Sequence, residues 1–260
     1  MSTPPARQSV RPSPIFLALL GLTGSGGVLA WLAGATPDRP LAYAGTFILV
    51  IGGWVVSLCL HEFGHAGTAW RFGDRDVAAR GYLTLNPLKY SNPMLSIGLP
   101  LLFIALGGIG LPGGAVWVRT GGMTKWQRTA ISLAGPSVNL MLAVLLLGAV
   151  RIGYPAQQDR LVFWSAIAFL GLLQVMATLL NILPIPPLDG YGALEPHLSP
   201  ATARALEPVK AWGFFLLLFV LLAPPLNRWF FSAVFGLYAA LGGLGMLASI
   251  GFDQTLFWQR

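Results

Sequence analysis

Seven long apolar stretches constrain the fold of this chain more than any other feature. They lie near residues 15–34, 41–60, 94–118, 129–150, 161–183, 211–226 and 229–252. An α-helix needs about 20 apolar residues to cross the hydrocarbon core of a bilayer, and most of the stretches reach that length. Only 10% of the 260 residues are charged, whereas soluble domains are about 25% charged. The sequence therefore predicts an all-α polytopic membrane protein rather than a soluble domain.

The distribution of lysine and arginine indicates how these stretches cross the membrane. If all seven crossed, the 16 basic residues would divide almost evenly between the two sides. If residues 94–118 instead enter and leave on one side, most basic residues share the side of the N-terminus, and the positive-inside rule makes that side cytoplasmic. Glycine and proline between residues 107 and 114 also suit a re-entrant segment. We therefore expect about six transmembrane helices plus a re-entrant or short β segment around residues 80–118, with residues 82–85 as a short strand or loop.

The domain organisation follows from the lack of any polar segment long enough to fold alone. We expect a single membrane domain over residues 1–260. It comprises an N-terminal segment with the first helix (1–40), a central core (41–195) and C-terminal helices (196–260). The residues around Ala33-Gly34-Ala35 resemble a signal-peptide cleavage site, but the apolar stretch before them is longer than the usual 7 to 15 or so residues, so we expect a retained helix. The net charge of +7 suits cytoplasmic loops and anionic lipid, and does not indicate nucleic acid.

His61, Glu62 and His65 directly continue the second apolar stretch. Ionisable groups at membrane depth cost roughly 2.5 to 3.5 kcal/mol or more each, so such groups are functional candidates. On a helix the two histidines lie one turn apart and about 40° around the axis, so both imidazoles can reach one metal ion. Glu62 then lies beside the metal, where a general base acts on a metal-bound water. The alternative is two structural histidines that happen to be four residues apart.

Asp189 is the candidate third ligand, because two histidines leave a catalytic zinc ion one protein ligand short. Most other acidic residues lie in polar or terminal segments. Pro184, Pro186 and Pro187 prevent the apolar helix from continuing. We therefore expect an extended segment that directs the Asp189 carboxylate sideways. The alternative is that Asp189 only forms a turn with the glycine that follows it.

Three segments, in this order, resemble the signature motifs of the site-2 protease family of intramembrane zinc metalloproteases. They are His61-Glu62-Phe63-Gly64-His65, Ala134-Gly135-Pro136-Ser137-Val138-Asn139 and Asn181-Ile182-Leu183-Pro184-Ile185-Pro186-Pro187-Leu188-Asp189-Gly190. The resemblance covers about residues 41–195. It implies a metalloprotease core of three helices, with one zinc ion held by His61, His65 and Asp189 and water activated by Glu62. Many members have two glycines after the aspartate, whereas this chain has Gly190-Tyr191-Gly192.

The resemblance also implies a role for Asn139 near the substrate or the oxyanion. A hydrogen bond between helices is the equally simple alternative for an asparagine in an apolar helix. Sequence alone leaves the two interpretations of Asn139 open.

We therefore expect an intramembrane zinc endopeptidase that hydrolyses peptide bonds within or next to transmembrane segments of other proteins. Its partners are the lipid bilayer and a transmembrane protein substrate, whose helix has to unwind before it is cut. Residues 82–85 are candidates for pairing with the unwound strand. We expect a multi-pass protein of the bacterial inner membrane, with its N-terminus and active site toward the cytoplasm; the oligomeric state stays open. The alternatives are a metal-binding transporter, which leaves Glu62 without a task, and an inactive membrane scaffold.

Overall fold

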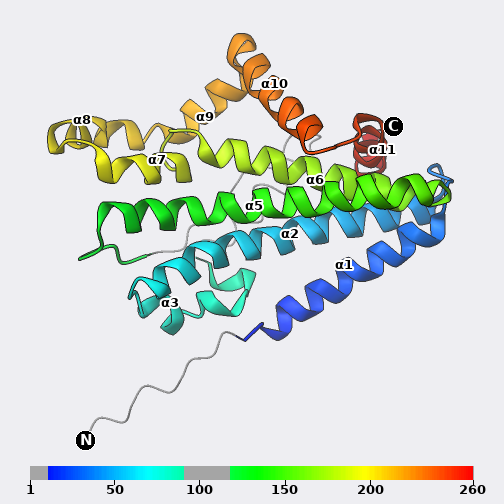
Figure 1. The fold of residues 1–260 in the computed structure, drawn as a ribbon, viewed down its shortest axis with the longest axis horizontal. Coiled ribbons are helices and arrows are strands. Elements are labelled where there is room, and N and C mark those ends of the chain that lie inside the picture. The colour runs from blue at the N-terminus through cyan, green and yellow to red at the C-terminus, as the bar shows by residue number, and fades with distance from the viewer. Residues whose placement is uncertain (1–10, 91–117, 260) are drawn as a thin grey trace, which may run out of the picture.

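The computed structural model describes residues 11–90 and 118–259, and within these ranges the chain forms α-helices and short 3-10 helices with no strand. Four α-helices are long and apolar enough to cross a membrane (Figure 1). They are α1 (Pro14–Ala33), α2 (Pro40–Arg71), α5 (Lys125–Gly153) and α6 (Leu161–Ile182). The predicted all-α polytopic membrane architecture is thereby confirmed.

The C-terminal part of the chain forms two bent pairs of helices instead of straight crossings. Counting each bent pair as one span gives up to six crossings. The pairs are α8 (Pro200–Lys210) with α9 (Gly213–Leu222), and α10 (Pro224–Ala240) with α11 (Gly245–Thr255). The second pair bends by 117°, because Gly242 takes a φ of 86° that reverses the chain. Helix α9 ends at Leu222, and the next residue, Ala223, has a ψ of 118°, the extended conformation favoured before a proline.

Residues 82–85, for which we expected a short strand or loop, do not form a strand. Residues Tyr82–Thr84 form a 3-10 helix between Gly81 and Leu85, which both have positive φ. Tyr82 and Leu83 are buried in the apolar cluster beside the C-terminal half of α2. A glycine before the segment and a proline after it mark turns as well as strand ends, and packing against α2 selects the turn here. The predicted re-entrant segment 94–118 lies, apart from Val118, outside the described residues.

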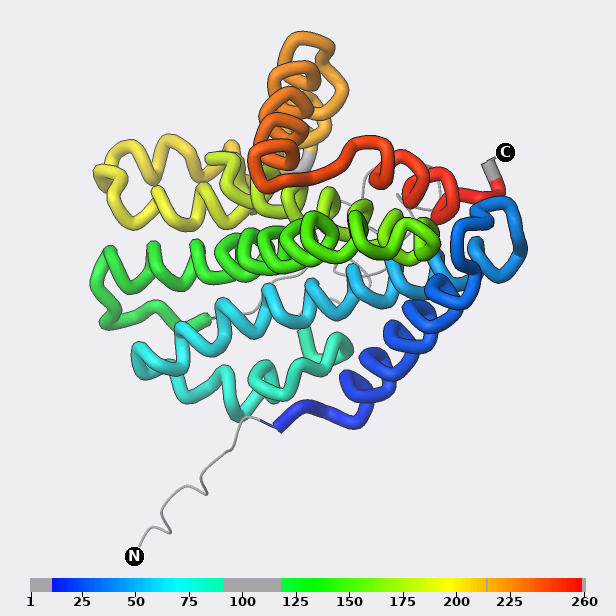
Figure 2. The backbone as a smooth tube through the Cα atoms, turned by 45° about the vertical axis from the view of Figure 1, so that its right-hand side comes forward, coloured from blue at the N-terminus to red at the C-terminus, as the bar shows by residue number. Residues whose placement is uncertain are grey.

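Helices α2, α5 and α6 form the centre of the bundle (Figures 1 and 2). Position 53 of α2 contacts Leu170 and position 57 contacts Gln174, so α2 and α6 run in the same direction. Helix α5 runs against both, since its position 134 lies beside position 64 of α2 and Leu147 lies beside position 171 of α6. The C-terminal halves of α2 and α6 therefore meet the N-terminal half of α5 at one end of the bundle.

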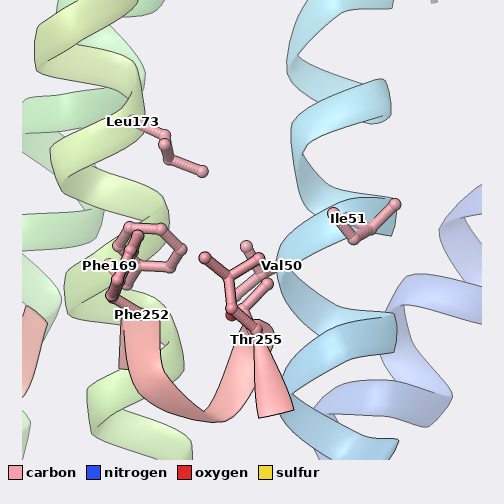
Figure 3. Close-up of a pocket in the computed structure, with 7 residues that line it drawn as sticks. Val50, Ile51, Phe169, Leu173, Phe252 and Thr255 are labelled. Carbon is pink, nitrogen blue, oxygen red and sulfur yellow. The ribbon is translucent and has the colours of Figure 1, made fainter. Parts of the chain in front are cut away.

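The outer helices differ from this centre in how much surface they leave for lipid. In the most apolar window of α6, 72% of the residues are buried, against 17% in α1. Helix α11 crosses α2 and α6 at the far end of the bundle (Figure 2). A small apolar pocket lies between these three helices (Figure 3), lined by Val50, Ile51, Phe169, Leu173, Phe252, Thr255 and Leu256. With only one threonine among aliphatic and aromatic side chains, this pocket offers no groups for chemistry.

Helix α5 starts at a well-defined cap. The Thr124 side chain accepts a hydrogen bond from the backbone N–H of Gln127, and the Gln127 side chain accepts one from the backbone N–H of Thr124. This reciprocal pair satisfies two N–H groups that the first turn of a helix leaves without helical partners. It fixes where α5 begins, and so fixes the register of the α5 residues that face α2.

Candidate metal centre

His61, Glu62 and His65 lie in the C-terminal half of α2, which is continuous over 32 residues. All three side chains belong to buried residues, and Glu62 is only 2% exposed. The Nε2 atoms of the two imidazoles are 3.1 Å apart, as expected for two histidines one helical turn apart. At about 48 Å, α2 is longer than the roughly 30 Å hydrocarbon core. Both histidines lie on one side of this helix, which is long enough to cross the hydrocarbon core and extend beyond it.

Asp189 brings its carboxylate to the same two rings. One carboxylate oxygen lies 3.3 Å from His61 Nε2 and the other lies 3.3 Å from His65 Nε2. Asp189 is the first residue of the short helix α7 (Asp189–Leu194). The contact joins residues more than 120 positions apart in sequence, so α2 and α7 are brought together by the fold and not by local geometry.

The segment before Asp189 is not extended, which corrects the sequence-based expectation. Leu183 to Leu188 form successive turns, in which the N–H of Ile185 bonds to the Leu183 carbonyl and the N–H of Leu188 to the Ile185 carbonyl. The prolines do end α6, but the chain then folds back against the C-terminal end of that helix. A Cβ at Gly190 would lie 2.6 Å from the Leu183 carbonyl oxygen, far inside contact distance, so only glycine permits this close approach.

The three side chains suit a zinc ion. One donor atom from each residue can be chosen so that all three lie within 4.8 Å of one another. Around a tetrahedral ion with bonds of about 2.0 to 2.1 Å, donor atoms lie about 3.3 to 3.4 Å apart, close to the 3.1 and 3.3 Å separations here. Two imidazoles and one carboxylate also match the His₂-acid set of catalytic zinc sites, which keep one position open.

Gly135 on α5 leaves the space that such an ion needs. A Cβ at this position would lie 2.5 Å from His61 Nε2 and closer still to His65 Nε2. Those separations are far below van der Waals contact, so a side chain at this position would collide with both rings. The absence of a side chain at position 135 therefore keeps open a cradle between the two rings.

The other ring nitrogens are held by α5. His65 Nδ1 donates to the Ile131 carbonyl oxygen at 2.7 Å, and His61 Nδ1 donates to Asn139 Oδ1. With both Nδ1 atoms acting as donors, both Nε2 lone pairs point toward the carboxylate, an arrangement that a bound cation stabilises. The two Nε2 atoms face both carboxylate oxygens of Asp189, and an ionised carboxylate there completes the donor set of a metal ion.

Asn139 hydrogen-bonds between helices, which is one of the two interpretations that its sequence left open. Its Oδ1 accepts from His61 on α2, and its Nδ2 donates to Gln174 Oε1 on α6 at 2.8 Å. A place near the substrate or the oxyanion stays a prediction. Sequence reasoning missed Gln174 and Gly135. An uncharged polar residue amid the apolar run of α6 was the available signal for Gln174, since buried amides in membranes need partners.

The third histidine of the chain does not belong to this centre. His197 is exposed, its Nε2 lies 2.9 Å from Thr129 Oγ1, and its ring lies 4.8 Å from that of Trp126. His197 is absent from the group of potential ligands formed by His61, His65 and Asp189 in the described part of the chain.

Comparison with known proteins identifies relatives along the whole length of the chain. It is 61% identical over 259 residues to "Putative zinc metalloprotease Rip2" of Mycolicibacterium smegmatis, covering 99% of this chain and 98% of that relative. It is 61% identical over 258 residues, with the same coverage, to the protein of that name in Mycobacterium tuberculosis. It is 32% identical over 180 residues to "Putative zinc metalloprotease YwhC" of Bacillus subtilis, covering 64% of this chain and 77% of the relative.

No family model matches the chain, and no solved structure matches it. The names of the relatives imply that the metal is zinc, and their bacterial origin together with the membrane-length helices indicates a bacterial membrane protein. The chain belongs to the Rip2 family of zinc metalloproteases.

Proposed function

We propose that the chain is a site-2 protease, an intramembrane zinc endopeptidase that cleaves other membrane proteins within or next to their transmembrane segments. The observation that carries the proposal is the position of the three potential ligands. His61 and His65 lie on a helix of membrane-spanning length, and Asp189 follows the end of another. A protease with its ligands there acts on peptide bonds that lie at or near membrane depth.

The charge distribution supports a cytoplasmic position for the site. The metal ligands lie toward the end of the bundle where α2 ends and α5 begins. Basic residues gather in the segments at that end, namely Arg71, Arg75, Arg80, Lys89, Arg119, Lys125 and Arg128. Fewer basic residues lie in the connections at the other end, between α1 and α2 and between α5 and α6. By the positive-inside rule the active site of this inner-membrane protein faces the cytoplasm.

Glu62 is the proposed general base. A zinc ion bound by His61, His65 and Asp189 would lower the pKa of a water molecule and polarise the carbonyl group of the scissile peptide bond. Glu62 accepts the proton of the attacking water and then delivers it to the leaving amine. Its burial at 2% exposure keeps bulk water from competing for this proton. One zinc ion per chain is sufficient for this chemistry.

The substrate has to expose a peptide bond before Glu62 can act. An intact helix protects each carbonyl with its own hydrogen bonds, so we expect substrates with glycine, proline or asparagine near the cut. Residues 82–85 no longer serve as a pairing strand in this proposal, since they form a buried 3-10 turn.

The experiment is proteolysis of a single-span substrate by the purified chain in lipid vesicles. We expect the wild type to cleave, and we expect Glu62→Gln or a zinc chelator to abolish cleavage while Glu62→Gln retains bound zinc. A metal-flux assay on the same vesicles tests the transporter alternative. Cleavage by Glu62→Gln at the wild-type rate, or metal flux without any cleavage, would contradict the proposal.

A further inference from the structure

A line of buried hydrogen bonds leads from His61 through three helices. His61 Nδ1 on α2 donates to Asn139 Oδ1 on α5, and Asn139 Nδ2 donates to Gln174 Oε1 on α6 at 2.8 Å. Gln174 Nε2 donates back to α2, to Ser57 Oγ at 2.9 Å. Ser57 Oγ donates to the backbone carbonyl of Trp54 at 2.7 Å. Gln174 is fully buried, and Asn139 and Ser57 are nearly so.

The donor and the acceptor of each bond can be assigned by starting at the Trp54 carbonyl and working back to His61. The Trp54 carbonyl can only accept, so the single proton of Ser57 points to it, and Ser57 Oγ has to accept from the Gln174 amide nitrogen. Gln174 therefore presents its oxygen to Asn139, which meets it with its own nitrogen. Asn139 is left with its oxygen toward His61, whose Nδ1 must carry the proton.

The consequence for His61 is a defined tautomer. With the proton on Nδ1, the lone pair of Nε2 points toward Asp189 and His65, where a metal would bind. His65 reaches the same state more directly, because its Nδ1 faces the Ile131 carbonyl, which can only accept. One ligand is thus oriented by backbone and the other by a relay of side chains.

We infer that Gln174 is a positioning residue for zinc binding, acting through Asn139 on His61. It fixes the Asn139 amide with its oxygen toward His61, and so prepares the Nε2 lone pair for the metal. The inference rests on the proposed function only in taking His61 as a zinc ligand. It assigns Asn139 to the orientation of His61, on the side of the imidazole away from the metal.

Gln254 on α11 provides a matched control. Like Gln174 it is fully buried, and it also contacts a hydroxyl group of α2, since Thr46 Oγ1 donates to Gln254 Oε1 at 2.9 Å. Thr46 precedes His61 by 15 residues, about 22 Å along the helix. Gln174→Met and Gln254→Met therefore remove the same kind of buried amide, near the metal centre and far from it.

The test measures the zinc affinity of the full-length protein by competition with a chelator. Partners of metal-ligating histidines typically contribute 10- to 100-fold in affinity, so we expect Gln174→Met to weaken zinc binding by about tenfold or more. We expect Gln254→Met to change the zinc affinity by less than about twofold, because a substitution this far from the metal centre acts independently of it. Gln174→Glu retains an acceptor for Asn139 and, as the neutral acid favoured by burial, a donor for Ser57. We expect this variant to recover most of the affinity.

A second readout follows the His61 ring itself. The chain has three histidines, so nitrogen-15 histidine labelling of the zinc-loaded protein gives a simple spectrum, and His197→Gln identifies the exposed one. We expect Gln174→Met to shift the Nδ1–H signal of His61 and to leave that of His65 in place. Unchanged His61 signals together with unchanged zinc affinity would overturn the inference, as would equal losses in both methionine variants. If the wild type binds zinc but cleaves nothing, the proposed function fails while this inference stands.

Discussion

Gly135→Ala tests the metal cradle most sharply, since it adds one methyl group beside both ligand rings. The new Cβ would lie 2.5 Å from His61 Nε2, against an ordinary contact of about 3.5 Å between heavy atoms. Either the rings or the helix therefore have to move by about 1 Å. Zinc ligation tolerates about 0.2 Å, so at least one histidine is lost. Because a four-ligand site is worth about 10 to 16 kcal/mol, one ligand accounts for roughly 2.5 to 4 kcal/mol.

That loss corresponds to a decrease in zinc affinity of about 10² to 10³-fold at 1.4 kcal/mol per tenfold. The assay is zinc competition on detergent-solubilised protein, with cleavage measured in parallel. Gly148→Ala on the same helix is the control, because a Cβ there meets nothing within 4 Å and alanine favours the helix by about 1 kcal/mol. Wild-type zinc affinity in Gly135→Ala would refute the reasoning, because the two rings could not then be the ligands as placed here.

Three further outcomes follow from the same geometry. Asp189→Asn removes the charged ligand 3.3 Å from both rings, so bound zinc should decrease by about 10²-fold or more in elemental analysis against chelator; undiminished binding would remove Asp189 from the site. Thr124→Ala breaks the capping pair of α5 and should lower the unfolding free energy by about 1 kcal/mol, measured by thermal denaturation in detergent; no change would contradict the stabilising effect assigned to the cap. In a model substrate, alanine in place of a glycine near the cut should slow cleavage several-fold by adding about 1 kcal/mol of helix propensity, whereas an unchanged rate would mean that unwinding is not required.

The sequence predicted the features that depend on local spacing. Membrane-length helices follow from long apolar stretches, and the approach of His61 to His65 follows from helical geometry alone. Asp189 could be selected by elimination because acidic residues are so few in this chain. Its contact with α2 then depends on the packing of α6 beside α2, for which no local pattern exists.

The features that sequence reasoning missed depend on contacts between distant segments. A segment between glycine and proline is compatible with a strand or a turn, and burial of Tyr82 against α2 decides for the 3-10 turn. The turns before Asp189 need the close approach of Gly190 to the end of α6. The role of Gln174 becomes apparent only in the folded chain, where α6 lies parallel to α2 and the Gln174 amide lies between Ser57 and Asn139. Such networks depend on how the helices are aligned against one another, and the spacing of residues along the sequence does not reveal that alignment.

X-ray absorption at the zinc edge of the purified protein tests the central claim most directly, that one ion is bound by two imidazoles of α2 and the carboxylate of Asp189. We expect zinc neighbours at about 2.0 to 2.1 Å, with the scattering pattern of two imidazoles plus oxygen and no sulfur. In any zinc that Asp189→Asn retains, the imidazole pattern should persist while the oxygen contribution falls. A spectrum with sulfur at about 2.3 Å, or identical spectra and zinc contents for the wild type and Asp189→Asn, would contradict the account.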